Sequence, residues 1–329
     1  MSANRLCDRA LWCELFHSKR ERPQGRLMEQ WRSGMAQEGK PVIGVVGLGS
    51  MGLGMAQTLA KKGFATLGFD LSAERKALAQ KANVMPADTL DLLFEKSNFL
   101  VFSLPTARDV ENVVNAHIHQ LSEGRGRVVI IDTSTSEPDV SRTLAQKLDA
   151  LGHGFLDAPV SGGPAGAASG NLTMMIGGSD ADLALAQPVI ESMAAKALHV
   201  GPSGAGNVAK LVNNLLAAAH MVTTSEGLKL ALAAGISPES ALRVLNAASG
   251  KSMISEVHFP TWIMNDRFDS GFSMGLMRKD VRLAQEMAER VGADNPLTSV
   301  VAKLWAGSGN LKDSDDFTRM GAFQPVSSK

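Results

Sequence analysis

Short apolar runs and helix-like segments alternate along residues 42–201. The run "VIGVV" (42–46) is rich in β-branched residues and glycines follow it directly, while residues 51–63 have apolar side chains at helical spacing. A second strand and a second helix are predicted at 65–70 and 73–81. Further strand-length apolar runs lie at 99–104, 127–132, 154–158, 172–177 and 197–201. This alternation predicts an α/β domain with a doubly wound parallel sheet.

The β-branched runs stop after residue 201, and the rest of the pattern is helical. Helices are predicted at 205–234, 238–249, about 276–292 and about 296–308. The first of them is about 30 residues long, well above the mean of 11–12 residues in globular proteins. We therefore expect an all-α C-terminal domain led by a long interdomain helix, a helix whose length also suits an oligomer interface.

The length of 329 residues agrees with two domains, because single cores rarely grow beyond roughly 250–300 residues. We expect an α/β domain at 41–202 and a helical domain at 203–322. Residues 1–34 carry six arginines and no clean apolar period. Our hypothesis is that they are a disordered extension or an artefact of an upstream start site, since Met35 opens a stretch typical of a domain start.

Charge and cysteine content narrow the functional classes. Lys+Arg and Asp+Glu both number 33, which gives no electrostatic reason to expect nucleic acid or an anionic membrane as a partner. No apolar run approaches the roughly 20 residues that span a bilayer. The only cysteines are Cys7 and Cys13, which fits a reducing compartment and predicts a cytoplasmic protein. The scattered histidines form no cluster with carboxylates or cysteines, so we expect no metal site.

A glycine-rich loop follows the first predicted strand. Gly47, Gly49 and Gly52 have the G-x-G-x-x-G spacing, and a helix follows at once. In such loops the first glycine permits a tight turn, the second lets the backbone approach a pyrophosphate, and the third allows close packing of helix and strand. The helix N-terminus then offers free N–H groups to the phosphates. We predict a dinucleotide site formed by this loop, Ser50 and Met51 included.

Asp70, at the end of the second predicted strand, bears on the choice of cofactor. It lies about 20 residues after the glycine loop, where an acidic side chain can accept hydrogen bonds from the ribose hydroxyls and would repel a 2′-phosphate. Leu71 follows in place of an arginine, so NAD is favoured over NADP. A helix-capping role for Asp70 is compatible with this reading. Arg75 and Lys76 in the next helix leave NADP open.

Two further stretches carry polar groups where ligands bind. Ser161, Gly162 and Gly163 follow a predicted strand and would present a hydroxyl and successive N–H groups to a small anion, although a plain flexible loop is the alternative. Lys210 and Asn214 are four residues apart in an apolar helix and therefore share one face. A desolvated lysine loses some preference for its charged form, which suits proton transfer; a solvated surface lysine is the competing interpretation.

Four motifs in series resemble the β-hydroxyacid dehydrogenase family over about residues 42–322: "GLGSMG" (47–52), "DAPVSGG" (157–163), "GAGNVAKLVNN" (204–214) and "GLMRKDVRLA" (275–284). The resemblance implies a Rossmann domain, a helical domain and substrate bound between them. It implies reversible hydride transfer between NAD and the 3-hydroxyl carbon of a small, 3-hydroxyisobutyrate-like acid.

The resemblance also assigns roles. Lys210 would be the acid–base residue, with Asn214 helping to hold the substrate and Lys279 lining the site near the nicotinamide. The substrate carboxylate would be held by Ser161, Gly162 and Gly163. Further cofactor contacts are implied at Leu104, Pro105 and Thr135. The family habit implies a homodimer or homotetramer.

Other functions remain open for a protein with this predicted fold. They are a reductase of tartronate-type semialdehydes, a dehydrogenase of threonate- or glycerate-like acids, a non-catalytic NAD-binding module and an imine reductase. The predicted loop at 249–272 matches no subfamily pattern, and it belongs to the domain expected to form one wall of the substrate site. Substrate identity is therefore left open by the sequence.

Overall fold

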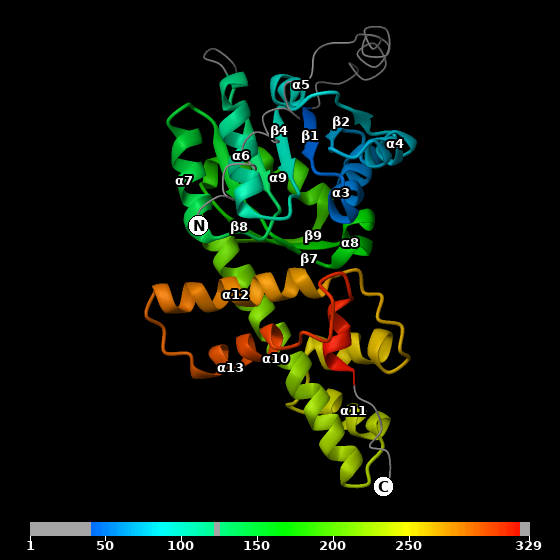
Figure 1. The fold of residues 1–329 in the computed structure, drawn as a ribbon. Helices are drawn as coiled ribbons and strands as arrows, with labels where there is room; N and C mark the ends of the chain where they lie inside the picture. The colour runs from blue at the N-terminus through cyan, green and yellow to red at the C-terminus, as the bar shows by residue number, and fades with distance from the viewer. Residues whose placement is uncertain (1–40, 122–125, 323–329) are drawn as a thin grey trace, which may run out of the picture. The chain divides into compact units, whose positions relative to one another are not determined.

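The computed structural model describes residues 41–121 and 126–322, which all fall within one compact unit, Pro41–Lys329. Figure 1 shows the fold of this unit as a ribbon. The extension expected at residues 1–34 lies outside the described residues. In the described ranges, no helix has an apolar stretch long enough to cross a membrane.

The described strands form one nine-stranded sheet with the order β3-β2-β1-β4-β5-β6-β8-β7, and β9 pairs with β8. Strands β1 to β6 pair with one another in parallel, in the order 3-2-1-4-5-6 of the dinucleotide-binding sheet. This confirms the predicted Rossmann-type fold. Their bounds are Val42–Val46, Ala65–Phe69, Met85–Pro86, Phe99–Phe102, Val129–Asp132 and Gly154–Asp157.

The sheet departs from a purely parallel one at its far edge. There β8 (Leu172–Gly177) runs antiparallel to both β6 and β7 (Val160–Ser161), while β9 (Ala194–Gly201) runs parallel to β8. The short β7 directly precedes the Gly162–Gly163 turn. The antiparallel edge therefore brings the polar loop at 161–163 beside the last strands of the sheet.

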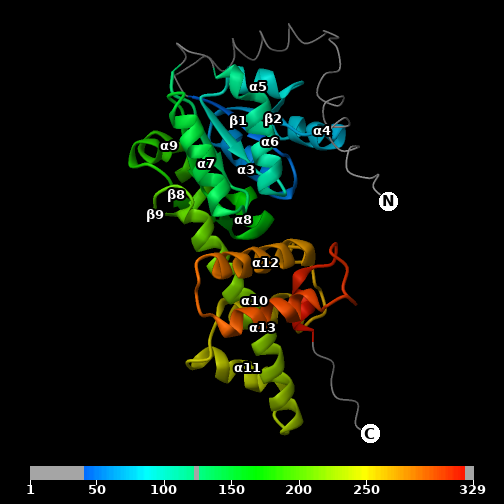
Figure 2. The ribbon, with the colours of Figure 1, turned by 60° about the vertical axis from the view of Figure 1, so that its left-hand side comes forward.

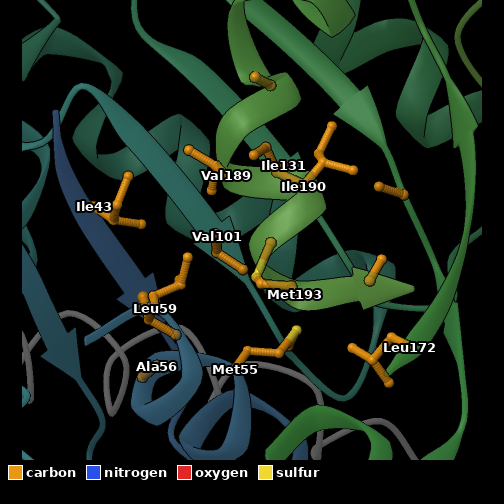
Figure 3. Close-up of a cluster of buried hydrophobic side chains, with 14 of the residues drawn as sticks. Ile43, Met55, Ala56, Leu59, Val101, Ile131, Leu172, Val189, Ile190 and Met193 are labelled. Carbon is orange, nitrogen blue, oxygen red and sulfur yellow. The ribbon is translucent and has the colours of Figure 1, made fainter. Parts of the chain in front are cut away.

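Helices cover the sheet because its central strands are buried on both faces. Residues one apart point to opposite faces, so Val129 and Ile131 belong to the cluster shown in Figure 3, whereas Ile130 points the other way. In Figure 3 side chains of β1, β4, β5 and β8 meet those of helices α3 (Ser50–Lys61) and α9 (Asp180–Met193). The labelled members are Ile43, Met55, Ala56, Leu59, Val101, Ile131, Leu172, Val189, Ile190 and Met193.

The other helices of this part connect successive strands. They are α4 (Ala73–Lys81), α5 (Leu90–Lys96), α6 (Ala107–His117), the 3₁₀ turn η1 (Ile118–Gln120), α7 (Pro138–Asp149) and α8 (Gly163–Ser169). Helix α8 occupies part of the stretch for which a flexible loop was the alternative. It is held against α3, because Thr58 Oγ1 donates to the Ala167 carbonyl at 2.7 Å.

After β9 the described chain is helical, as predicted, and Figure 2 shows these helices from a second side. They are α10 (Ala205–Ala233), α11 (Pro238–Ala247), η2 (Ile254–Ile263), α12 (Met274–Arg290), α13 (Pro296–Ala306) and η3 (Phe317–Gly321). Their core includes fully buried Trp305, whose Nε1 donates to the Ala218 carbonyl at 3.2 Å. The prediction of a loop at 249–272 was wrong in part, because η2 is a ten-residue π-helix.

A buried carboxylate fastens the N-terminus of α10 to the sheet. Asp157, the last residue of β6, accepts hydrogen bonds from Gly204 N at 2.7 Å and Asn207 N at 2.9 Å. Gly206 makes this close approach possible, since a Cβ there would lie 2.4 Å from the carbonyl oxygens of Asp157 and Met175. The first turn of α10 therefore packs directly on sheet backbone.

We expect Gly206→Ala to destabilise the protein and Gly227→Ala, further along α10, to stabilise it slightly. The first substitution forces a methyl group against backbone and should cost about 1–3 kcal/mol or more. The second meets nothing within 4 Å and removes a mid-helix glycine, for a gain of roughly 0.5–1 kcal/mol. Urea denaturation midpoints of both variants measure this, and equal midpoints would contradict the backbone contact.

Candidate functional site

The glycine loop between β1 and α3 is shaped by close backbone contacts. Gly47 has φ +87°, and a Cβ on it would lie 2.3 Å from the Ser103 carbonyl oxygen. A Cβ on Gly52 would lie 1.9 Å from the Gly47 carbonyl oxygen, whereas one on Gly49 would meet nothing within 4 Å. Among residues 41–121 and 126–322, no side chain caps α3 at Gly49. The loop thus has open space over Gly49 and an uncapped helix N-terminus, which fits a pyrophosphate.

Asp70 follows β2 and is tied to the glycine loop. Its Oδ2 accepts a hydrogen bond from Leu48 N at 2.7 Å, and its Oδ1 accepts one from Ser72 N at 2.8 Å. The carboxylate is half-buried, while Leu71 beside it is exposed. Asp70 therefore supports the loop directly and stands at its edge.

Lys279 of α12 joins the loops that follow β4 and β5. Its Nζ donates to the Thr135 carbonyl at 2.8 Å and to the Pro105 carbonyl at 3.3 Å. The same two loops are joined by Leu104 N, which donates to Ser134 Oγ at 2.9 Å. The structure thus brings together Leu104, Pro105, Thr135 and Lys279, four of the residues expected at the cofactor.

Asp132, the last residue of β5, lies beneath these loops. Its Oδ1 accepts a hydrogen bond from Ser134 N at 3.0 Å, and its Oδ2 has no hydrogen-bond partner in the described part of the chain. The pKa of Asp132 is raised to about 7, chiefly by burial; the hydrogen bonds from Ser134 oppose this rise, and the negative charge of neighbouring Asp157 adds to it. The sequence motifs did not single out this group.

Lys210 lies in the second turn of α10 and is 7% exposed. Burial lowers the pKa of its ammonium to about 8; the negative charge of Asp280 opposes this shift, and the positive charge of Lys279 adds to it. Solvation at the surface, the competing interpretation, does not describe this side chain. A lysine in this state can exchange a proton near neutral pH.

Asn214 lies one helical turn after Lys210 and is also buried. Its Nδ2 donates to Asp280 Oδ2 at 2.6 Å, and its Oδ1 accepts from Asn213 Nδ2 at 3.1 Å. Asp280 was missed from the sequence. The sequence did indicate that Asp280 is buried: it lies three residues after Met277 and four before Ala284, and therefore on the apolar face of α12.

Ser161, Gly162 and Gly163 lie where β7 passes into α8. Both glycines have positive φ, +126° and +63°, and no side chain of the described residues caps α8. The helical part of the chain borders this turn, since a Cβ on Gly163 would lie 3.8 Å from the Ser270 carbonyl oxygen. In the described part of the chain no hydrogen bond joins these three residues to Lys210.

The described residues contain no group of three or more His, Cys, Asp and Glu side chains arranged to hold a metal ion. The polar groups near Lys210 are instead an ammonium, an amide and a carboxylate. All three can form hydrogen bonds with a ligand.

Comparisons with known proteins agree with this geometry. Residues 42–201 match the family model described as the NAD-binding domain of 6-phosphogluconate dehydrogenase. Residues 204–322 match the model described as NAD-binding of NADP-dependent 3-hydroxyisobutyrate dehydrogenase. The two matches meet near the junction of β9 and α10.

Individual relatives cover most of the chain. The 2-(hydroxymethyl)glutarate dehydrogenase of Eubacterium barkeri is 34% identical over 80% of this chain and 88% of its own length. Mitochondrial 3-hydroxyisobutyrate dehydrogenase of Mus musculus is 34% identical over 84% of this chain and 83% of its own length. A structure of Mycobacterium tuberculosis 3-hydroxyisobutyrate dehydrogenase with L-serine is 31% identical, covering 85% of this chain and 98% of that one, with a TM-score of 0.80. The chain belongs to the β-hydroxyacid dehydrogenase family of NAD(P)-dependent oxidoreductases.

Proposed function

We propose that the protein interconverts a small 3-hydroxy carboxylic acid, 3-hydroxyisobutyrate-like, and the corresponding 3-oxo compound, with Lys210 as the acid–base residue. The observation that carries the proposal is the buried Lys210, which lies one helical turn from Asn214 and is acted on by the charge of Lys279, the residue that contacts the loops after β4 and β5. A bound nicotinamide supplies the hydride acceptor or donor at C4. Lys210 accepts the proton of the 3-hydroxyl group in oxidation and returns it in reduction.

The remaining residues hold the substrate and the cofactor. Asn214 has a second N–H on Nδ2 with which to bind the substrate beside Lys210. The substrate carboxylate is bound by the Ser161 hydroxyl and the N–H groups that open α8. The dinucleotide is bound by Gly47, Gly49, Ser50, Met51, Gly52 and Asp70, with Leu104, Pro105, Thr135 and Lys279 near the nicotinamide.

In this proposal the domain at 41–202 binds the dinucleotide, and the domain at 203–322 binds the substrate and forms the oligomer. Support for a homodimer or homotetramer comes from exposed apolar side chains on α10, where Leu230 is 72% exposed and Leu216 52%. Light scattering of the purified protein measures the oligomeric state. We place the protein in the cytoplasm, on the support of cysteines confined to Cys7 and Cys13.

Tartronate-type semialdehydes and threonate- or glycerate-like acids are alternative substrates for the same residues. A non-catalytic NAD-binding module would have no use for a buried lysine whose burial costs free energy. The structurally similar imine reductases are 16–18% identical and support the shared fold alone.

The proposed function is tested with a panel of 3-hydroxy acids, polyhydroxy acids and semialdehydes, each with NAD and NADP, followed by nicotinamide absorbance. We expect turnover with a 3-hydroxyisobutyrate-like acid, and Lys210→Ala should lower kcat by about 10²–10⁴-fold while NAD binding persists. Lys229→Ala, an exposed lysine on the same helix, is the matched control. Activity of Lys210→Ala within a few-fold of wild type would remove the lysine from this role.

The pH dependence follows from the lowered pKa of Lys210, about 8. Oxidation needs the neutral amine as base, so kcat/KM for the hydroxy acid should rise about tenfold per pH unit below pH 8 and level off above it. Reduction needs the ammonium as acid, so its kcat/KM should fall above the same pH. Profiles in both directions measure this, and parallel profiles would contradict a single acid–base lysine.

We also propose that Asp70 makes NAD the preferred cofactor, because its carboxylate repels a 2′-phosphate. Asp70→Asn removes the charge and keeps an acceptor oxygen for Leu48 N. The ratio of kcat/KM with NADP to that with NAD should rise by about tenfold, equivalent to roughly 1.4 kcal/mol. Glu74→Gln, an exposed acidic residue in the first turn of α4, removes the same charge nearby and should leave the ratio unchanged. An equal rise in both variants would refute a specific role of Asp70.

A further inference from the structure

Asp280 is a charged residue in an apolar position. It lies on α12 among the buried residues Met277, Val281 and Ala284, and it is 1% exposed. Removing a carboxylate from water costs several kcal/mol unless partners replace the lost hydration. The contacts of Asp280 therefore show which groups stabilise its buried carboxylate.

The two carboxylate oxygens of Asp280 serve different partners. Oδ2 accepts the hydrogen bond from Asn214 Nδ2 at 2.6 Å. Oδ1 lies 3.3 Å from Lys279 Nζ and has no hydrogen bond from any residue that the structure describes. The buried carboxylate of Asp280 thus connects α10 to Lys279, which contacts the loops after β4 and β5. Its Oδ1 can still accept a hydrogen bond.

The contact with Asp280 orients the Asn214 amide. An ionised carboxylate only accepts hydrogen bonds, so the group of Asn214 that faces it must be the NH₂. The amide oxygen then points toward Asn213, from which it accepts. Asn214 is therefore held as a donor on the side of Asp280, which leaves its second N–H for a ligand next to Lys210.

Asp280 also supplies charge to Lys210. The charged groups that act on Lys210 are Asp280 and Lys279, both from α12; the negative one favours the ammonium and the positive one opposes it. The buried Asp132 acts on Lys279 through charge. Because Lys210 gains and loses a proton in each turnover, a fixed negative charge limits the cost of its protonated state.

We propose that Asp280 is a positioning residue: a buried carboxylate that fixes the Asn214 amide and acts as the counter-charge for Lys210 and Lys279. This inference rests on the proposed acid–base role of Lys210. It adds a residue from α12 that acts through the lysine and the amide.

The test is Asp280→Asn, which keeps an acceptor oxygen for Asn214 and removes the charge. The pH at which oxidation levels off should move down by about one unit, because the negative charge of Asp280 favours the Lys210 ammonium and the variant lacks it. The KM for NAD should stay within about twofold of wild type. Glu286→Gln removes a half-buried charge, ion-paired with Arg282, from the same helix and should leave the profile in place. An unmoved profile in Asp280→Asn would overturn the proposal.

A second variant should shift the pKa of Lys210 in the opposite direction. Lys279→Met removes the opposing cation, so the pKa of Lys210 should rise; a merely structural role for Asp280 predicts no such pair of opposite shifts. If Asp280→Asn does not fold, Asp280→Ser, which also removes the charge, decides, and an unchanged pKa of Lys210 in that variant overturns the proposal.

A readout without turnover separates this proposal from the proposed function. Nuclear magnetic resonance of isotope-labelled lysine in the NAD complex follows the Lys210 ε-group directly, with its signal assigned by its loss in Lys210→Met. A lower pKa of Lys210 in Asp280→Asn supports the counter-charge role even if no acid in the panel is turned over. In that case only the proposed function fails. An unchanged titration overturns the counter-charge even if the wild-type enzyme is active.

Discussion

The attachment of α10 to the sheet by Asp157 is the contact on which the rest of the structure depends. A carboxylate at the end of β6 satisfies the N–H groups of Gly204 and Asn207, which a helix start would otherwise leave unpaired. Its charge also complements the positive end of the helix. Asn207 extends this junction, accepting from Ser136 N at 2.9 Å and donating to Ser141 Oγ at 3.0 Å. Lys210 follows in the next turn, so its position is set by the strand ends themselves.

Burial and charge act on Lys210 in opposite directions, and their balance decides what the side chain can do. Burial alone would drive a lysine toward its neutral form, and the neighbouring Lys279 adds to that effect. Asp280 works against both, so the pKa settles at about 8, close to neutral pH. The three residues come from two helices, and neither helix by itself would create this balance.

Features with a local physical cause could be predicted from the sequence. The strand–helix alternation and the spacing of Gly47, Gly49 and Gly52 predicted the fold and the glycine loop, because each depends on residues close together in the chain. Lys210 and Asn214 could be placed on one face for the same reason. Their partner could not be identified, since Asp280 is 66 residues from Asn214 and pairs with it only after α10 and α12 pack.

Other features escaped prediction because tertiary contacts override local propensity. Helix α8 is short and glycine-rich, and it is held by packing against α3 through Thr58 and Ala167. The π-helix η2 contains Pro260, which on propensity alone argues against any helix. In both places neighbours fix a conformation that the local residues do not favour.

The length of α10 has a mechanical consequence. With 29 residues it extends about 43 Å at 1.5 Å per residue, and Lys210 lies only about 7–8 Å from the end fastened at Asp157. A tilt of about 5° about that fastening would carry the far end through about 4 Å and Lys210 through less than about 1 Å. Because Lys210 lies close to the pivot, it hardly moves when the far end of α10 does, and the geometry around it can stay constant.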